Sequence, residues 1–190
     1  MSDNKIIYQQ IRNATVKITY HGQTFLVDPY FRPKGEDGCF QIAPKPELKK
    51  LKNPLVELPM PIKEIIKDIN AVVLSHTHGD HWDDVAAKNI PKSVPVFVQN
   101  NSDQNLLKSQ GFTDVRIVGH ETLFNGITIT KTEEKHGTDD VIPILEKNVN
   151  FVWDLFLEHL EKKLCTLLEI LFGLKILKSL LKHIILTILS

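Results

Sequence analysis

Apolar and polar residues alternate over residues 14–20 (ATVKITY), which predicts a β-strand with one buried face. The pair His21-Gly22 is a turn signal, and residues 23–27 (QTFLV) read as a second strand, so a hairpin is expected. Asp28-Pro29 closes the hairpin. Residues 31–61 hold six prolines and two glycines and predict a long loop, and long loops of compact domains are often functional.

The middle of the chain alternates between predicted helices and short strands. Helices are expected over residues 62–69, 84–89 and 102–110, and strands over residues 71–75, 94–98, 114–118 and 127–131. Pro61 suits the first turn of a helix, Asp83 suits an N-cap, and Gly111 suits a helix end. Residues 71–75 (AVVLS) form an apolar run typical of a strand buried on both faces. The alternation predicts an α/β fold with some parallel strand pairing.

The last 40 residues differ in composition from the rest of the chain. Leu and Ile make up 18 of residues 151–190, against 25 of residues 1–150, and the segment has no proline and one glycine, Gly173. Polar residues recur there at three- and four-residue steps, which indicates an amphipathic helix. The expected organisation is therefore an incomplete domain over residues 1–146 and a Leu-rich helical tail over residues 147–190.

The helical tail is expected to pack on the core of the domain. Two alternatives remain open for it, namely binding to a membrane surface and self-association of two chains through the helix. A transmembrane segment is not expected in the tail, because its longest stretch without a charged residue is 183–190, and a bilayer span needs about 20 apolar residues.

Charge and cysteine content narrow the function classes. Lys plus Arg and Asp plus Glu both number 23, so charge gives no reason to expect a nucleic-acid partner. Cys39 and Cys165 lie far apart and imply no disulfide framework, and the N-terminal residues lack the apolar stretch of a secretory signal. We therefore expect a cytoplasmic globular protein that acts on a small-molecule substrate.

Three histidines and one aspartate follow the predicted strand 71–75 within six residues. They are His76, His78, Asp80 and His81. Imidazole and carboxylate are ligands that zinc prefers, and α/β proteins bind ligands at the C-terminal ends of their strands. In an extended backbone His76 and His78 point to the same side, and a turn at Gly79 lets Asp80 and His81 form a second pair. The loop therefore predicts a metal site, with room for two adjacent ions.

The segment SHTHGDHWD resembles the H-x-H-x-D-H signature of the metallo-β-lactamase superfamily. The surrounding residues, about 12–145, are similar to its bacterial branch of small metal-dependent hydrolases, which includes ascorbate-6-phosphate lactonase-like proteins. The resemblance implies that the chain forms the N-terminal part of an αββα sandwich. It also implies that Asp28 contacts the metal ligands rather than the metal, and so sets the orientation of those ligands.

The same resemblance assigns the ligands. His136 would join His76 and His78 in a three-histidine site that leaves one position open for water. Asp80 and His81 would serve a second ion, and Asp80 is also the candidate that orients or deprotonates the attacking water. No ligand spacing recommends the remaining histidines, which are His21, His120, His159 and His183. Trp82 is expected to pack beneath the loop.

The metal ligands that the second half of the family's domain supplies have no match in this sequence. That half supplies a bridging aspartate in a Gly-Asp-Thr-like strand end and a final histidine, but no Gly-Asp pair follows residue 146. We therefore expect one tightly bound Zn²⁺ and an incomplete second site. A frameshift or fusion near codons 145–150 would explain the change in composition, and a genuine short variant with a helical cap is the alternative.

The sequence thus predicts a zinc-dependent hydrolase in which metal-bound hydroxide attacks an ester, lactone or phosphoester bond, with activity impaired by the missing ligands. The alternative is a non-catalytic metal-binding remnant, or an interaction module that uses the C-terminal helix. Residues 31–61 and the segment after His136 are expected to border the substrate pocket. Lactam hydrolysis is not implied, because a fold does not fix a function.

Overall fold

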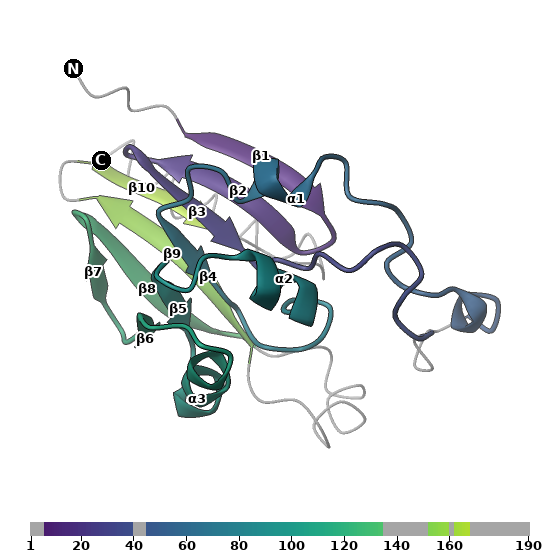
Figure 1. Ribbon diagram of the computed structural model, residues 1–190. Helices are drawn as coiled ribbons and strands as arrows, with labels where there is room; N and C mark the ends of the chain where they lie inside the picture. The colour runs from purple at the N-terminus through teal and green to yellow at the C-terminus, as the bar shows by residue number, and fades with distance from the viewer. Residues whose placement is uncertain (1–5, 40–44, 135–151, 160–161, 168–190) are drawn as a thin grey trace. The chain divides into compact units, whose positions relative to one another are not determined.

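The computed structural model describes residues 6–39, 45–134, 152–159 and 162–167. The chain divides into two compact units, of which the first ends at Ile117 and the second begins at Val118. Strands, short helices and long loops alternate in the first unit, whereas the regular elements described in the second are all strands (Figure 1). The mixed α/β class expected from the sequence is confirmed.

Unit 1 contains a six-stranded sheet in which the strands lie side by side in chain order. They are β1 (Ile7–Arg12), β2 (Thr15–Tyr20), β3 (Gln23–Val27), β4 (Ala71–Val73), β5 (Val96–Val98) and β6 (Val115–Ile117). The first three strands pair antiparallel, and β3 to β6 pair in parallel. The predicted hairpin and the predicted parallel pairing are both present. Strand β1 was not predicted, because its sequence IYQQIR does not alternate.

Three α-helices connect the parallel strands, namely α1 (Ile62–Ile65), α2 (Asp84–Asn89) and α3 (Asn101–Ser109). A 3-10 helix, η1 (Leu48–Lys50), lies in the long loop after β3. Pro61 and Asp83 precede α1 and α2 as N-caps, and Gly111 follows α3 with a φ of +92°, as the sequence predicted. Helix α1 is four residues shorter than expected, since Asp68 adopts a left-handed φ of 58° that a helix cannot contain.

The core of unit 1 encloses the strand that leads to the candidate site. Every residue of β4 is at most 1 % exposed, which confirms a strand buried on both faces. Leu74, directly after β4, is also fully buried and belongs to the same apolar cluster as Ile65, Ile90 and Leu107 of the connecting segments. Each such side chain contributes about 1.5–3 kcal/mol of burial free energy. The start of the following loop is therefore fixed by packing.

Unit 2 contains a four-stranded antiparallel sheet. Its strands, in spatial order, are β10 (Lys162–Leu167), β9 (Val152–His159), β8 (Ile127–Glu134) and β7 (Thr122–Phe124). Strands β7 and β8 form a hairpin around Asn125 and Gly126, both of which have positive φ angles of 50° and 83°. Strand β9 pairs with β8 over all eight of its residues.

The prediction of a helical tail is wrong for residues 152–159 and 162–167, which form strands β9 and β10. The three- and four-residue spacing of polar residues is a weak local signal, and pairing with β8 overrides it by supplying a partner for the backbone of β9. The aromatic and β-branched residues of VWDLFLEH also favour a strand. The predicted boundary at residue 146 and residues 168–190 of the predicted tail lie outside the described residues. Within the described ranges, no helix is long and apolar enough to cross a bilayer.

Candidate metal centre

The loop that carries the predicted ligands begins directly after β4 and ends at α2. It spans residues 74–83 and is called the metal loop below. Strands β3 and β4 are parallel neighbours with Val27 opposite Val73. The loops that follow these two strands therefore leave the same edge of the sheet. This arrangement brings Asp28, which follows β3, beside the loop that holds the histidines.

Asp28 joins the two loops. It is fully buried and has a left-handed φ of 43°, and its N–H donates to the carbonyl of Val73 at 3.0 Å. Its Oδ1 accepts from the N–H of Ser75 at 2.8 Å, and its Oδ2 accepts from the Ser75 hydroxyl at 2.7 Å. Oδ2 also lies 3.0 Å from Nδ1 of His81. A buried carboxylate needs such partners to offset the loss of water, and here they come from the metal loop.

His76, Asp80 and His81 form a compact group of ligand atoms. One ligand atom of each lies within 4.8 Å of the others. The rings of His76 and His81 have centroids 3.8 Å apart, and both residues are buried. Nitrogen and oxygen donors from histidine and aspartate match the ligand set of zinc-type ions, so the residues present fit a divalent metal.

Ser75 connects the two buried histidines. Its hydroxyl lies 2.9 Å from Nδ1 of His76 and 3.3 Å from Nδ1 of His81. These contacts at Nδ1, together with that of Asp28, favour Nε2 as the ligand atom of each ring. These contacts of Ser75 could not be predicted from the sequence, because a serine at a strand end carries no metal signature by itself.

The electrostatics of the group favour a positive charge. Burial lowers the pKa of His81, but the charge and hydrogen bond of Asp28 and the charge of Asp80 outweigh burial and raise the pKa above its ordinary value. The same negative groups that stabilise a protonated imidazole would stabilise a metal cation at this position.

The resemblance implies two further ligands, His78 and His136, and only His78 belongs to the described residues. The ring of His78 packs edge-on against that of His76, with centroids 4.4 Å apart and an interplanar angle of 84°. His136 lies outside the described residues. The three-histidine site implied by the resemblance therefore stays a prediction, and the structure brings His76 together with Asp80 and His81.

Two side chains of the loop, one between the ligands and one after them, anchor it to the rest of unit 1. Thr77 donates through Oγ1 to Oδ1 of Asp103 on α3 at 2.7 Å. Trp82 is 4 % exposed, donates through Nε1 to Oε1 of Gln110 at 2.9 Å, and packs against Phe112. Trp82 therefore packs within unit 1, as expected from the sequence.

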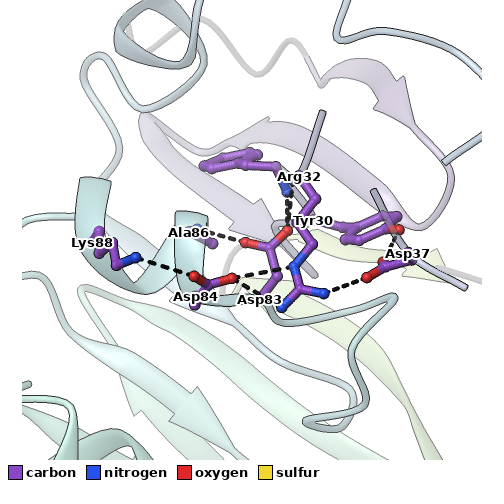
Figure 2. A network of polar contacts seen from close by, with 8 residues as sticks. Tyr30, Arg32, Asp37, Asp83, Asp84, Ala86 and Lys88 are labelled. Carbon is purple, nitrogen blue, oxygen red and sulfur yellow. Dashed lines mark hydrogen bonds and ion pairs between the residues drawn. The ribbon is translucent and has the colours of Figure 1, made fainter. Parts of the chain in front are cut away.

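A polar network ties the loop after β3 to the start of α2 (Figure 2). Asp37 accepts from the hydroxyl of Tyr30 and from the guanidinium of Arg32. Arg32 also donates through Nη2 to Oδ1 of Asp84 at 3.0 Å, and Lys88 donates to Oδ2 of Asp84 at 3.1 Å. Burial and the hydrogen bond to Asp37 raise the pKa of Tyr30, so the phenol stays protonated. This network could not be predicted from local sequence patterns, since its partners lie up to 52 residues apart.

A surface groove lies along the same loop. Its lining includes Phe31, Leu58, Met60 and Ile62, together with Val85 of α2. None of the metal-site residues lines the groove, so we do not count it as the substrate pocket. The expectation that residues 31–61 border that pocket stays a prediction.

Comparison with known protein families gives an extended match. Residues 9–161 match the model of the β-lactamase superfamily domain. The match continues past residue 146, where the sequence analysis placed the end of the domain, and the frameshift near codons 145–150 stays a prediction. A curated relative, the UPF0173 protein YddR of Bacillus subtilis (strain 168), is 41% identical over 128 residues, which are 67% of this chain and 49% of the relative. The match therefore spans about half the length of that relative.

Solved structures of similar proteins agree with this match. A possible metal-dependent hydrolase from Veillonella parvula DSM 2008 is 37% identical with a TM-score of 0.81, over 95% of this chain and 68% of its own. An isothiocyanate hydrolase from Delia radicum gut bacteria is 34% identical with a TM-score of 0.77, over 92% of this chain and 67% of its own. Igni18, a metallo hydrolase from Ignicoccus hospitalis, shares the fold at 15% identity and a TM-score of 0.54.

Proposed function

Because the chain belongs to the metallo-β-lactamase superfamily, we propose that it is a metal-dependent hydrolase whose metal is held by the loop after β4. The observation that carries the proposal is the group of ligand atoms from His76, Asp80 and His81, which lie within 4.8 Å of one another. Asp28 supports the proposal because it contacts the metal loop at Ser75 and His81.

Zinc is the ion that we propose for this site. Histidine nitrogen and aspartate oxygen are ligands that Zn²⁺ prefers. His76, Asp80 and His81 would hold the ion. His78, from the family signature, and His136, at the place of the family's third histidine, are further candidate ligands. One zinc is proposed, because the chain has no Gly-Asp pair after residue 146 that would complete a second site.

The residues of the group differ in their access to substrate. A bound zinc ion would supply Lewis-acid chemistry, by lowering the pKa of water and polarising the bond to be broken. The side chain of Asp80 is 38% exposed, against 8% for His81. We therefore assign Asp80, in addition to its part in holding the ion, to orient the attacking water and to accept its proton, whereas the buried histidines would only hold the ion. Ser75 and Asp28 would keep both imidazole rings in the orientation that presents Nε2.

The proposed substrate is a small molecule with an ester, lactone or phosphoester bond. An isothiocyanate is a further candidate, because the 34% identical solved relative is an isothiocyanate hydrolase. We propose that hydrolysis is slow, since the ligands of a second ion are incomplete.

The test is hydrolysis of a panel of esters, lactones, phosphodiesters and isothiocyanates by the purified chain. We expect turnover of at least one class that chelator abolishes and that added zinc restores, and no turnover by Asp80→Asn. The Asp84→Asn variant, which changes an exposed carboxylate outside the ligand group, should behave as the unchanged chain. Folded protein that binds zinc without turnover would favour the non-catalytic metal-binding alternative. Turnover that chelator does not affect would contradict the proposal.

A further inference from the structure

Asp83 lies two residues after His81 and accepts three hydrogen bonds from backbone N–H groups (Figure 2). Its Oδ1 accepts from Ala86 at 2.6 Å, which caps α2. Its Oδ2 accepts from Phe31 at 2.6 Å and from Arg32 at 2.7 Å. The residue is 4 % exposed. Helix capping uses only one of the two oxygens, so the second oxygen has a separate role.

Asp28 and Asp83 connect the same two loops in opposite directions. The Asp28 carboxylate reaches from the loop after β3 to Ser75 and His81 in the metal loop. The Asp83 carboxylate reaches from the end of the metal loop back to the backbone of Phe31 and Arg32, in the loop after β3. The two loops are therefore held at both ends of the segment that carries the ligands. Asp83 therefore adds, at the α2 end of the segment, a backbone connection to those that Asp28 makes at Ser75 and His81.

We propose that Asp83 is a positioning residue for the metal site, which fixes Asp80 and His81 by holding the metal loop to the backbone of residues 31 and 32. The inference rests on the proposed function, since it concerns the same metal site. Hydrogen bonds from backbone N–H groups to a carboxylate are strong and geometrically restrictive, and Asp83 receives one from α2 and two from the loop after β3. Metal affinity depends on ligands held in place before binding, so loss of this connection should weaken binding.

The variant Asp83→Asn tests whether the site needs both carboxylate oxygens or only a polar side chain of this size. An asparagine keeps one carbonyl oxygen and replaces the other oxygen with an NH₂ group. It therefore cannot accept from Ala86 and from the backbone of Phe31 and Arg32 at the same time, and its NH₂ faces an N–H group on one side.

Asp84 provides a matched control, because it is the neighbouring carboxylate in the same helix turn. Its side chain is 54% exposed and, among the residues that the structure describes, makes ion pairs with Arg32 and Lys88. Exposed ion pairs contribute little and hold no backbone in place. Asp84→Asn therefore removes a carboxylate of the same network without breaking the connection between the loops.

The experiment measures zinc affinity by competition with a chromophoric chelator, the visible spectrum of the Co²⁺-substituted protein, and the thermal stability of the metal-free protein. We expect Asp83→Asn to weaken zinc binding about 10- to 100-fold and to change the Co²⁺ spectrum. Asp84→Asn should leave both unchanged. Lower stability of Asp83→Asn with unchanged zinc affinity and an unchanged spectrum would overturn the inference and leave the proposed function standing. Failure of the unchanged chain to bind zinc would overturn both.

A second measurement needs no variant and applies even where Asp83→Asn does not fold. Coupling between two sites is reciprocal, so zinc binding should slow hydrogen exchange at the amides that donate to Asp83. We expect slower exchange at Phe31, Arg32 and Ala86 in the zinc-bound protein. Zinc binding that slows exchange at His81 but not at these three amides would contradict the positioning role.

Discussion

Asp28 and His81 are 53 positions apart in the sequence, yet Oδ2 of Asp28 lies 3.0 Å from Nδ1 of His81. The contact exists because β3 and β4 are parallel neighbours, so the residues that follow them meet at one edge of the sheet. Asp28 is fully buried and His81 is 6 % exposed, so water screens this contact little. The pair links the fold of unit 1 to the orientation of a candidate metal ligand.

Replacing Asp28 with asparagine should weaken zinc binding about 10- to 100-fold, because the imidazole of His81 loses its charged partner. Asparagine tolerates the left-handed φ of 43°, so the backbone should keep its conformation. Competition with a chromophoric chelator measures the affinity. Asp68→Asn is the control, since Asp68 is also left-handed, at 58°, but exposed. Equal affinities of the two variants would contradict the role of Asp28.

Replacing Thr77 with valine should destabilise the protein by about 1–3 kcal/mol, because it removes the hydroxyl that donates to the buried carboxylate of Asp103. The other oxygen of that carboxylate has no hydrogen-bond partner among the described residues, so no second hydrogen bond of this carboxylate compensates for the loss. Urea unfolding measures the change. Thr113→Val removes an exposed hydroxyl bonded to the carbonyl of Lys92, and we expect a change within about 0.5 kcal/mol. A Thr77 variant as stable as the control would show that the contact does not stabilise the loop.

Replacing Trp82 with phenylalanine should lower the free energy of unfolding by about 1 kcal/mol, because the ring still packs on Phe112 but the hydrogen bond to Gln110 is lost. Since Trp82 is 4 % exposed, we expect the KM for any hydrolysed substrate to stay the same. Thermal melts and initial rates check the two expectations. A higher KM with unchanged stability would instead place Trp82 against the substrate.

The strand assignment of residues 152–159 predicts specific neighbours. Leu157 of β9 lies opposite Ile129 of β8. In the NMR spectrum we expect cross-strand contacts between the backbone protons of these two residues, and Cα shifts typical of extended backbone over β9. Strong contacts between the amide protons of successive residues would instead support the helix that the sequence analysis predicted.

The candidate metal ligands that the structure brings together could be predicted from the sequence because they lie in one short segment. His76, Asp80 and His81 fall within six residues after a buried strand, so local spacing carried the signal. Asp28 was found only through the family resemblance. Its partners Ser75 and His81 lie 47 and 53 positions away, and no local pattern reports such contacts.

The remaining contacts of the site depend on tertiary structure. Asp83 was predicted correctly as the N-cap of α2, but its hydrogen bonds to the backbone of residues 31 and 32 were not, because they arise from the meeting of two loops. Strand β9 was misread as helix for a related reason. Its local polar spacing is outweighed by pairing with β8, which sequence periodicity does not encode.

The most direct test of the account is a zinc titration of the metal-free chain and of its His81→Ala variant, with His120→Ala as the control. His120 is exposed and lies outside the ligand group. We expect one equivalent of tightly bound zinc for the unchanged chain and for the control, and loss of tight binding for His81→Ala. An unchanged chain without tight zinc binding, or a His81→Ala variant that binds zinc as tightly as the control, would contradict a metal centre in the loop after β4.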